Sequence, residues 1–445
     1  MKNDLGKSIL HLKPPGNWLN DPNGFIYYKG TYHLFYQHFP YAPIWGTMHW
    51  GHATSHDLVH WEHQNIAVFP SIYEDQNGCY SGCAIEYKER MHLFYTGVHY
   101  LKTNYENIHA SVDEQFEESQ LTLVSDDGMH FDNFNNKYVI IPVIEDSAIG
   151  DRTHTRDPKV WRGKDAWYMI LGSTINGERG RLLFYRSYDL YKWQFVNSVS
   201  EGGGFGWMCE CPDYFEIDNN KVLIFSSMRK AEDGSKLDSQ TICTLVDFDE
   251  TTCTMNIPKN YQYFDYGLEL YATQSTTDAL GRRVLVAWLR MPKPVDNEWI
   301  GMLSIPRVVE VKNGHIYFRV HPDVECKFNK LCSDIPKLSE SGYRICAELS
   351  DGDMINIGGY KVFRSENCIC TDKTAVAAGK KGEQLHFKTP VVKDGFYVDI
   401  YVEPHTVEVF VNNGEYTISN YVYGLGNSIE ADNIQNCKIF VIAQP

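Results

Sequence analysis

One strand pattern recurs along the first two thirds of the chain and limits the fold more than any other feature. Short aromatic-rich runs of alternating residues return at intervals of roughly 50 to 75 residues. Since no window of about a dozen residues shows a clear helical period, the chain is predicted to be all-β. The leading runs are Tyr32–Gln37, Met91–Thr96, Ala166–Leu171, Lys221–Ser226 and Arg283–Trp288.

Three of these runs are followed by a serine, a turn with aspartate at a fixed offset and a closing aromatic residue. These elements are Ser55–Trp61, Ser125–Phe131 and Ser187–Trp193. A degenerate repeat with one strand–turn–aromatic unit per period is typical of a β-propeller, in which each blade is a small antiparallel sheet. The leading runs therefore predict a five-bladed β-propeller over residues 1–310.

The composition changes after this region, because tryptophan is absent beyond Trp299. Short alternating runs such as Tyr397–Glu403 and Thr406–Val411 follow, the second ending in an Asn-Asn-Gly turn. This pattern is typical of antiparallel hairpins. We predict a C-terminal β-sandwich over residues 335–445, with residues 311–334 as a connecting segment and the two domains packed together.

Charge and hydropathy exclude several classes of protein. The 445 residues carry 41 Lys and Arg against 57 Asp and Glu, a net charge of −16, without a basic run. Nucleic acid is therefore not an expected partner. No stretch of about 18 apolar residues could span a membrane. The polar start Met1–Ser8 has no apolar leader core, so a cytoplasmic location is expected.

The cysteines and histidines do not predict a metal or cofactor. The 12 cysteines are scattered from Cys79 to Cys437, and the pairs Cys209/Cys211 and Cys368/Cys370 are spaced too closely for a zinc site. Reduced thiols packed as small hydrophobic groups are expected instead. Structural or hydroxyl-binding roles are expected for the histidine cluster His49, His52, His56, His60 and His63.

Three acidic residues lie at the openings of different predicted blades, each close to a proline. They are Asp21 in Trp18–Gly24, Asp157 in Arg156–Val160 and Glu210 in Trp207–Asp213. Each segment alone could be a turn or a local ion pair. A propeller, however, gathers its innermost strands around one axis, so the three carboxylates are expected to converge. Converging carboxylates without metal-ligand spacing suit glycoside hydrolysis.

Trp18–Gly24 resembles the signature of glycoside hydrolase family 32, the β-fructofuranosidases, which include invertases, sucrose-6-phosphate hydrolases and fructanases. Arg156–Pro158 and Glu210–Pro212 resemble the second and third blocks of that family, in the same order. The resemblance spans nearly the whole chain and implies a five-bladed propeller followed by a β-sandwich. Further matches are Tyr36–Gln37, Trp45–Ala53, Tyr80–Gly82, Tyr266–Gln274, Trp288, Ser304–Arg307 and Val407–Asn412.

The resemblance implies that Asp21 is the nucleophile, Glu210 the general acid/base and Asp157 the transition-state stabiliser. An ionised Asp21 and a protonated Glu210 would suit an oxocarbenium-like transition state. Arg156 is expected to favour the ionised form of its neighbour Asp157. The expected substrate-binding residues are Asn20, Gln37, Trp45, Tyr80, Ser81, Arg156 and Trp288.

The leading hypothesis is a retaining hydrolase that forms a covalent fructosyl-enzyme. It would release terminal β-D-fructofuranosyl residues from sucrose, sucrose 6-phosphate or short fructo-oligosaccharides, so the expected partner is a small sugar. The alternatives are a fructosyltransferase on the same scaffold, an inverting propeller glycosidase that acts on arabinan or xylan, and a non-catalytic carbohydrate-binding propeller. The sequence does not choose between sucrose and its 6-phosphate and does not indicate an oligomeric state.

Overall fold

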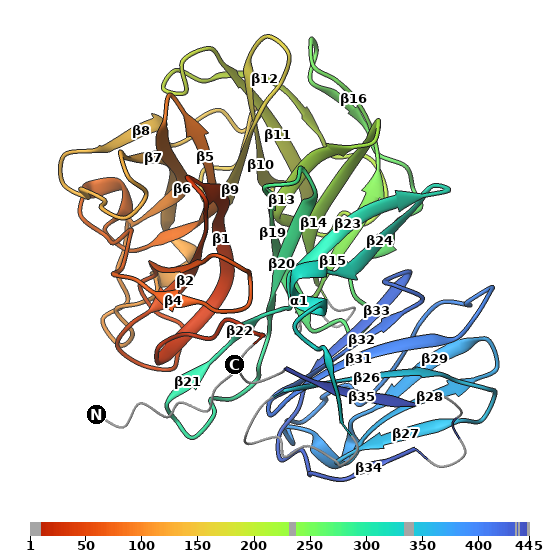
Figure 1. Ribbon diagram of the computed structural model, residues 1–445. Coiled ribbons are helices and arrows are strands. Elements are labelled where there is room, and N and C mark those ends of the chain that lie inside the picture. The colour runs from red at the N-terminus through yellow and green to blue at the C-terminus, as the bar shows by residue number, and fades with distance from the viewer. Residues whose placement is uncertain (1–9, 231–236, 333–341, 432–433, 435–436, 443–445) are drawn as a thin grey trace.

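A computed structural model describes residues 10–230, 237–332, 342–431, 434 and 437–442. Within these residues five antiparallel sheets form the blades of a β-propeller, and two further sheets form a β-sandwich beside it (Figure 1). The predicted fold class, an all-β chain with a five-bladed propeller followed by a sandwich, is confirmed.

The first three blades each take up one continuous stretch of chain, apart from one added strand. Blade one has β1 (Asn17–Tyr28), β2 (Thr31–Phe39), β3 (His49–Ser55) and β4 (Glu62–His63), and β21 (Trp299–Ile300) is added parallel to β1. Blade two has β5 (Cys79–Tyr87), β6 (Arg90–Tyr100), β7 (Phe116–Ser125) and β8 (Lys137–Ile141). Blade three has β9 (Thr155–Arg162), β10 (Trp167–Ile175), β11 (Arg179–Ser187) and β12 (Gln194–Val199).

The last two blades contain longer excursions. Blade four has β13 (Met208–Ile217), β14 (Asn220–Lys230), β15 (Leu237–Leu245) and β18 (Gln262–Tyr263), with the hairpin β16 (Asp247–Asp249) and β17 (Thr254–Asn256) inserted. Blade five has β19 (Leu270–Thr277), β20 (Arg283–Leu289), β23 (Arg307–Lys312) and β24 (His315–Val320), and β22 (Met302–Leu303) pairs with β20. Because β21 belongs to this stretch and pairs with β1, it ties the last blade to the first.

The sandwich consists of two facing sheets. One has the order β25 (Lys330–Cys332), β35 (Lys438–Val441), β26 (Tyr343–Glu348), β31 (Tyr397–Glu403), β32 (Thr406–Val411), β33 (Tyr416–Tyr421). The other has the order β30 (His386–Lys388), β29 (Cys368–Asp372), β28 (Tyr360–Ser365), β27 (Met354–Ile357), β34 (Ile429–Glu430). Helical structure is limited to α1 (Pro322–Glu325) and short 3₁₀ turns at Tyr73–Asp75, Val112–Glu114 and Thr374–Val376, within the described part of the chain.

The boundary predicted at residue 310 falls inside a strand. Residue 310 is in β23, which pairs with β24, so the fifth sheet continues to Val320. The predicted connecting segment therefore contains the last propeller strand, α1 and the first sandwich strand. The absence of tryptophan did not mark the domain boundary, because the outer hairpin β23–β24 is built from short alternating runs like those of the sandwich. We propose a division between Val320 and Lys330.

Each innermost strand has a β-bulge at an equivalent position, which connects the local sequence to the site. The strand registers shift between Leu19 and Pro22, Cys79 and Gly82, Arg156 and Lys159, Glu210 and Asp213, and Tyr271 and Gln274. A bulge leaves a residue out of the ladder and redirects the side chains beside it. It also tolerates proline, which has no ladder donor. The Asp-Pro and Cys-Pro pairs of the sequence blocks lie in these bulges.

The propeller and the sandwich share a buried charge network. Arg307 of β23 is fully buried, and its guanidinium donates to Asp265 Oδ2 at 3.1 Å and to Glu408 Oε2 at 2.7 Å. His11 lies between Glu403 and Glu408, at 2.5 and 2.8 Å. Buried charges are stable only when paired in this way, so the network fixes the sandwich against the propeller.

Candidate active site

The three predicted carboxylates line one cavity of about 310 Å³ at the bulged ends of the innermost strands. Asp21 comes from β1, Asp157 from β9 and Glu210 from β13, so three blades each supply one acid. All of the predicted site residues except Trp288 line this cavity; the others are Asn20, Gln37, Trp45, Tyr80, Ser81 and Arg156.

A cysteine thiol brings the two aspartates together. The Sγ of Cys211 lies 3.6 Å from Asp21 Oδ2 and 3.6 Å from Asp157 Oδ2. The backbone amide of Cys211 also donates to Asp157 Oδ2 at 2.8 Å. Cys211 has a φ of 46°, a left-handed conformation that its bulge imposes. Because Cys211 directly follows Glu210, this bulge places all three acids around one point.

Asp21 is held by neighbours that favour its ionised form. Ser81 Oγ donates to Oδ2 at 2.6 Å, and the Asn20 amide donates to Oδ1 at 3.1 Å. Burial acts in the opposite direction, and together with the charge of Glu210 it raises the pKa of Asp21 to about 6. A pKa of about 6 favours the ionised form of Asp21 at neutral pH.

Opposing effects act on the pKa of Asp157. Burial raises the pKa of Asp157 to about 8; Arg156 acts in the opposite direction, whereas the charges of Glu210 and Asp21 add to the rise. The guanidinium of Arg156 donates to Glu210 and Glu118 rather than to Asp157. Arg156 therefore favours the ionised form of Asp157, as expected from their adjacency, but burial has the larger effect on the pKa of Asp157.

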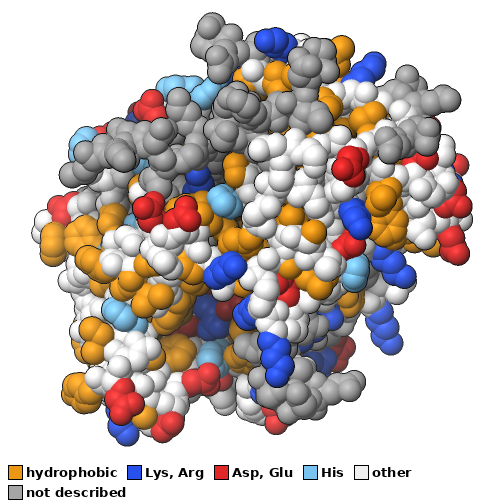
Figure 2. Space-filling view, turned by 90° about the horizontal axis from the view of Figure 1, so that it is seen from below, with side chains coloured by type: hydrophobic (Ala, Val, Ile, Leu, Met, Phe, Trp, Pro, Cys, Tyr) orange, Lys and Arg blue, Asp and Glu red, His pale blue; other side chains and the backbone are white. Residues whose placement is uncertain are grey.

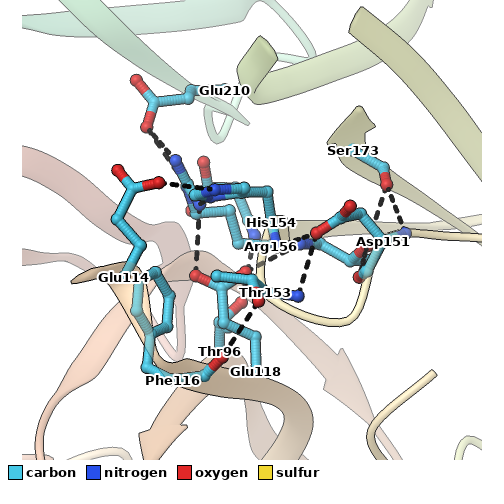
Figure 3. Close-up of polar contacts among 12 residues, drawn as sticks. Thr96, Glu114, Phe116, Glu118, Asp151, Thr153, His154, Arg156, Ser173 and Glu210 are labelled. Carbon is cyan, nitrogen blue, oxygen red and sulfur yellow. Dashed lines mark hydrogen bonds and ion pairs between the residues drawn. The ribbon is translucent and has the colours of Figure 1, made fainter. Parts of the chain in front are cut away.

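Both carboxylate oxygens of Glu210 have a partner. Arg156 donates to Oε1 through Nε at 3.1 Å and through Nη2 at 3.0 Å. Tyr271, on β19 of the fifth blade, donates its hydroxyl to Oε2 at 2.7 Å. Figure 3 shows Glu210 on one side of Arg156 and Glu118 on the other. Two blades therefore fix the orientation of this carboxyl group.

The predicted sugar-binding residues differ in how they are placed. Gln37 is anchored through its amide to the Cys79 carbonyl at 2.9 Å. Trp45 and Tyr80 form an edge-to-face pair with centroids 6.3 Å apart, and Trp45 is 41% exposed at the mouth of the cavity. An aromatic pair of this kind can cover the apolar face of a sugar.

Trp288 does not line the cavity, which corrects its predicted role. Its ring lies 6.2 Å from that of Trp18, and it packs against the cluster of Cys211, Tyr271 and Ala272. Trp288 therefore supports residues of the site from behind. The sequence block containing Trp288 gave no sign of which side of the strand would face the axis.

Several lining residues were not predicted. They are Met48, Glu114, Phe116, His154, Trp207 and Met228. His154 and Trp207 lie only two and three residues before Arg156 and Glu210, so proximity to the blocks could have identified them. Glu114 and Phe116 follow the long β6–β7 loop, where His109 accepts from the Thr47 amide at 3.3 Å. No sequence pattern linked that loop to the mouth of the cavity.

The loop before Trp45 and the β6–β7 loop carry exposed apolar side chains. Tyr41 and Ile44, from the loop before Trp45, are 74% and 55% exposed, and Tyr105 and Ile108 of the β6–β7 loop are 93% and 61% exposed. Phe39 and His109 join the two loops through ring contact, with centroids 4.8 Å apart. Figure 2, a view from below, shows hydrophobic side chains gathered beside a hollow in which charged side chains are recessed.

The histidines that could suggest a metal are dispersed. His52 contacts His33, His60 contacts Asp57, and His63 contacts the Tyr36 hydroxyl. Among the residues that the structure describes, no group of three or more His, Cys, Asp or Glu side chains could hold a metal ion. Over the same residues, no helix has the length and apolar character needed to cross a membrane.

The comparisons with known proteins agree with this geometry. Residues 11–322 match the family model described as the glycosyl hydrolases family 32 N-terminal domain. The chain belongs to glycoside hydrolase family 32. The resemblance inferred from the sequence blocks is therefore confirmed.

Among curated relatives, the sucrose-6-phosphate hydrolase of Bacillus subtilis is 31% identical and aligns over 94% of this chain and 88% of its own. A raffinose invertase of Escherichia coli is 30% identical over 94% of this chain and 90% of its own. A solved Bombyx mori GH32 β-fructofuranosidase is 26% identical, with a TM-score of 0.81 and coverage of 98% and 93%. The Lactobacillus gasseri sucrose-6-phosphate hydrolase structure, at 22% identity and TM-score 0.83 over 99% and 94%, shows the shared fold.

Proposed function

We propose that this family 32 glycoside hydrolase is a retaining β-fructofuranosidase. It releases the terminal β-D-fructofuranosyl residue of sucrose or a short fructo-oligosaccharide through a covalent fructosyl-enzyme. The observation that carries the proposal is the joint placement of Asp21 and Glu210, from different blades, in one cavity. Their partners differ, since hydroxyl and amide groups hold Asp21 whereas a guanidinium and a phenol hold Glu210.

Asp21 is the nucleophile of the proposed mechanism. Ser81 and Asn20 orient its carboxylate, and with a pKa of about 6 most of it is ionised at neutral pH. As the glycosidic bond lengthens, positive charge develops on the fructosyl ring. A carboxylate in a water-poor cavity stabilises that charge and then bonds to the anomeric carbon.

Glu210 is the general acid/base. In the first step its proton passes to the glycosidic oxygen, which lets the glucosyl group leave. In the second step it takes a proton from the water that attacks the fructosyl-enzyme. The contacts from Arg156 and Tyr271 hold the carboxyl group in one orientation for both steps.

Asp157 is the transition-state stabiliser. Its Oδ2 is fixed by the Cys211 amide and thiol, so the carboxyl group can bind fructosyl hydroxyls without moving. Burial raises the pKa of Asp157 to about 8, which favours the protonated form. It can therefore donate to a hydroxyl oxygen as well as accept from one.

The assignment of the two acids is tested with one variant of each. Asp21→Ala is expected to lose sucrose hydrolysis by several orders of magnitude, because the covalent step has no nucleophile. Glu210→Ala is expected to keep more activity on fructosides with good leaving groups, which need no proton. If both variants cleave sucrose like the parent, the assignment is wrong.

The stereochemistry is tested separately. Early-time NMR of the parent reaction should show β-fructofuranose before mutarotation, because two displacements restore the starting configuration. Initial release of the α-anomer would indicate direct attack by water.

Transfer to a sugar is the alternative with the same intermediate. The exposed aromatic and apolar side chains beside Trp45 offer a surface on which an acceptor sugar could stack. Oligosaccharides that appear at high sucrose concentration would support it. The arabinan- or xylan-active and non-catalytic alternatives lose their basis, since the chain belongs to family 32. Sucrose 6-phosphate is the substrate named for several relatives, and the sequence does not choose between it and sucrose. The cytoplasmic location stays a prediction.

A further inference from the structure

A fourth acidic side chain, which the proposed mechanism does not use, lies behind the three carboxylates. Glu118 is on β7, the third strand of blade two, and its side chain is fully buried. Its Oε2 accepts from the Thr155 amide at 2.7 Å, and its Oε1 accepts from Arg156 Nη1 at 3.2 Å. Burial raises the pKa of Glu118 to about 7, although Arg156 and the Thr155 amide act in the opposite direction. A buried acid next to a reacting centre needs an explanation.

Arg156 connects Glu118 to the proposed acid/base. One edge of the guanidinium, formed by Nε and Nη2, donates to Glu210 Oε1, while Nη1 on the other edge donates to Glu118 Oε1 (Figure 3). A planar guanidinium has donors in a fixed fork. Fixing one edge therefore fixes the direction of the other, so the Arg156–Glu210 contact depends on Glu118.

The charges matter as much as the geometry. Arg156 places a cation at hydrogen-bond distance from Glu210, where it attracts the carboxyl oxygens. Glu118 places a second carboxylate on the same cation, which weakens that attraction. We propose that Glu118 is a positioning residue for Glu210: it aims the Arg156 guanidinium at the acid/base and neutralises part of the charge of that guanidinium. This inference rests on the proposed function of Glu210.

Other titratable groups also face Glu210 from the surrounding strands. They are Asp21 of β1, Tyr80 of β5, His154 directly before β9, Asp157 of β9, Tyr271 of β19, and the thiols of its chain neighbours Cys209 and Cys211. The Glu118 substitution leaves each of these side chains chemically in place. A shift in the pH profile of a Glu118 variant therefore reports the charge of that side chain.

The test compares Glu118→Gln with the parent in kcat and KM on sucrose from acid to alkaline pH. Glutamine has the same shape and an oxygen that can accept from Arg156 and Thr155, but it has no charge. The basic limb of kcat/KM is expected to move to lower pH by about one unit, because the charge of Arg156 is then less fully offset. At pH 7.5 to 8 the kcat of Glu118→Gln on sucrose is expected to fall while its KM changes little. The kcat on a fructoside with a good leaving group is expected to fall less.

Glu117→Gln is the matched control. Glu117 is the preceding residue of β7, and its carboxylate accepts from the surface residue Arg152 at 2.7 Å rather than from Arg156. This variant is expected to keep the parental pH profile. Glu118→Asp, which keeps the charge with a shorter side chain, should lower kcat without moving the basic limb.

The inference is overturned if folded Glu118→Gln, with the parental melting temperature, shows the parental basic limb. It is also overturned if Glu118→Asp shifts that limb as far as the glutamine variant. If Glu118→Gln does not fold, Glu118→Asn is the second neutral variant, and its basic limb must shift in the same direction. Parental activity of Asp21→Ala would instead contradict the proposed function, so the two failures are distinguishable.

Discussion

Replacement of Ser81 by alanine tests the electrostatic account of the nucleophile. The Ser81 hydroxyl donates to Asp21 Oδ2 at 2.6 Å and stabilises the ionised carboxylate against burial, which has raised the pKa of Asp21 to about 6. A hydrogen bond to a charged group contributes about 1.5 to 3 kcal/mol. Since one pKa unit corresponds to about 1.4 kcal/mol, removal of the bond should raise the pKa of Asp21 by about one to two units.

The sign and size of the effect on rate follow directly. The nucleophile must be ionised, so the acid limb of kcat/KM should move to higher pH in Ser81→Ala. With a rise of about 1.5 units, the ionised fraction at pH 7 falls from about nine tenths to about a quarter. The loss should be largely recovered at higher pH, where Asp21 is again ionised.

The assay is the initial rate of glucose release from sucrose at limiting substrate across the pH range. Ser81→Thr keeps the hydroxyl and serves as the control, with an acid limb close to the parental one. An unchanged acid limb in Ser81→Ala, or one at lower pH, would refute the argument that this hydroxyl stabilises the Asp21 carboxylate.

Three further predictions concern the rest of the molecule. Burial opposes protonation of His11, but hydrogen bonds and charge from Glu403 and Glu408 raise the pKa of His11 to about 9. Protonated His11 therefore stabilises the fold by about 3 kcal/mol. This contribution is complete below about pH 6.5 and is lost as the pH rises through 9. Urea unfolding at pH 6 and pH 9.5 should show this loss, and His11→Gln should abolish the difference. Arg307→Met should destabilise the protein by about 3 to 5 kcal/mol, since Asp265 and Glu408 lose their buried partner; a change below about 0.5 kcal/mol in the same assay would contradict a structural role. Trp45→Ala should raise the KM for sucrose, whereas Trp288→Phe should leave the KM near the parental value, because Trp45 lines the cavity and Trp288 does not. A larger rise of KM in Trp288→Phe than in Trp45→Ala would restore the predicted role of Trp288.

The sequence predicted the parts of the fold that depend on local pattern. The strand–turn–aromatic repeat is periodic because the serine of each such unit closes a turn within its own blade. For example, Ser55 Oγ accepts the Leu58 amide at 2.9 Å, and Ser187 Oγ accepts the Leu190 amide at 2.9 Å. The end of blade five could not be placed in this way, since its last hairpin has no such turn.

The candidate site was predictable where a sequence block coincides with a bulge. Asp21, Asp157 and Glu210 each lie in or directly beside one, and their prolines mark it. Residues that reach the site from outside a block were missed, as Glu118 on a third strand illustrates. The raised pKa of Asp157 could not be inferred from the sequence, because burial is a property of the assembled blades and its effect exceeds that of the adjacent arginine.

The central claim is that Asp21 forms a covalent bond to the fructosyl group while Glu210 handles the protons. Glu210→Ala mixed with a fructoside that has a good leaving group should accumulate the intermediate, because the base that activates water is missing. Rapid acid quench, proteolysis and mass spectrometry should then find the mass of one fructosyl residue on the peptide that contains Asp21. A fructosyl group found on another residue, or none during a burst of leaving-group release, would contradict the account.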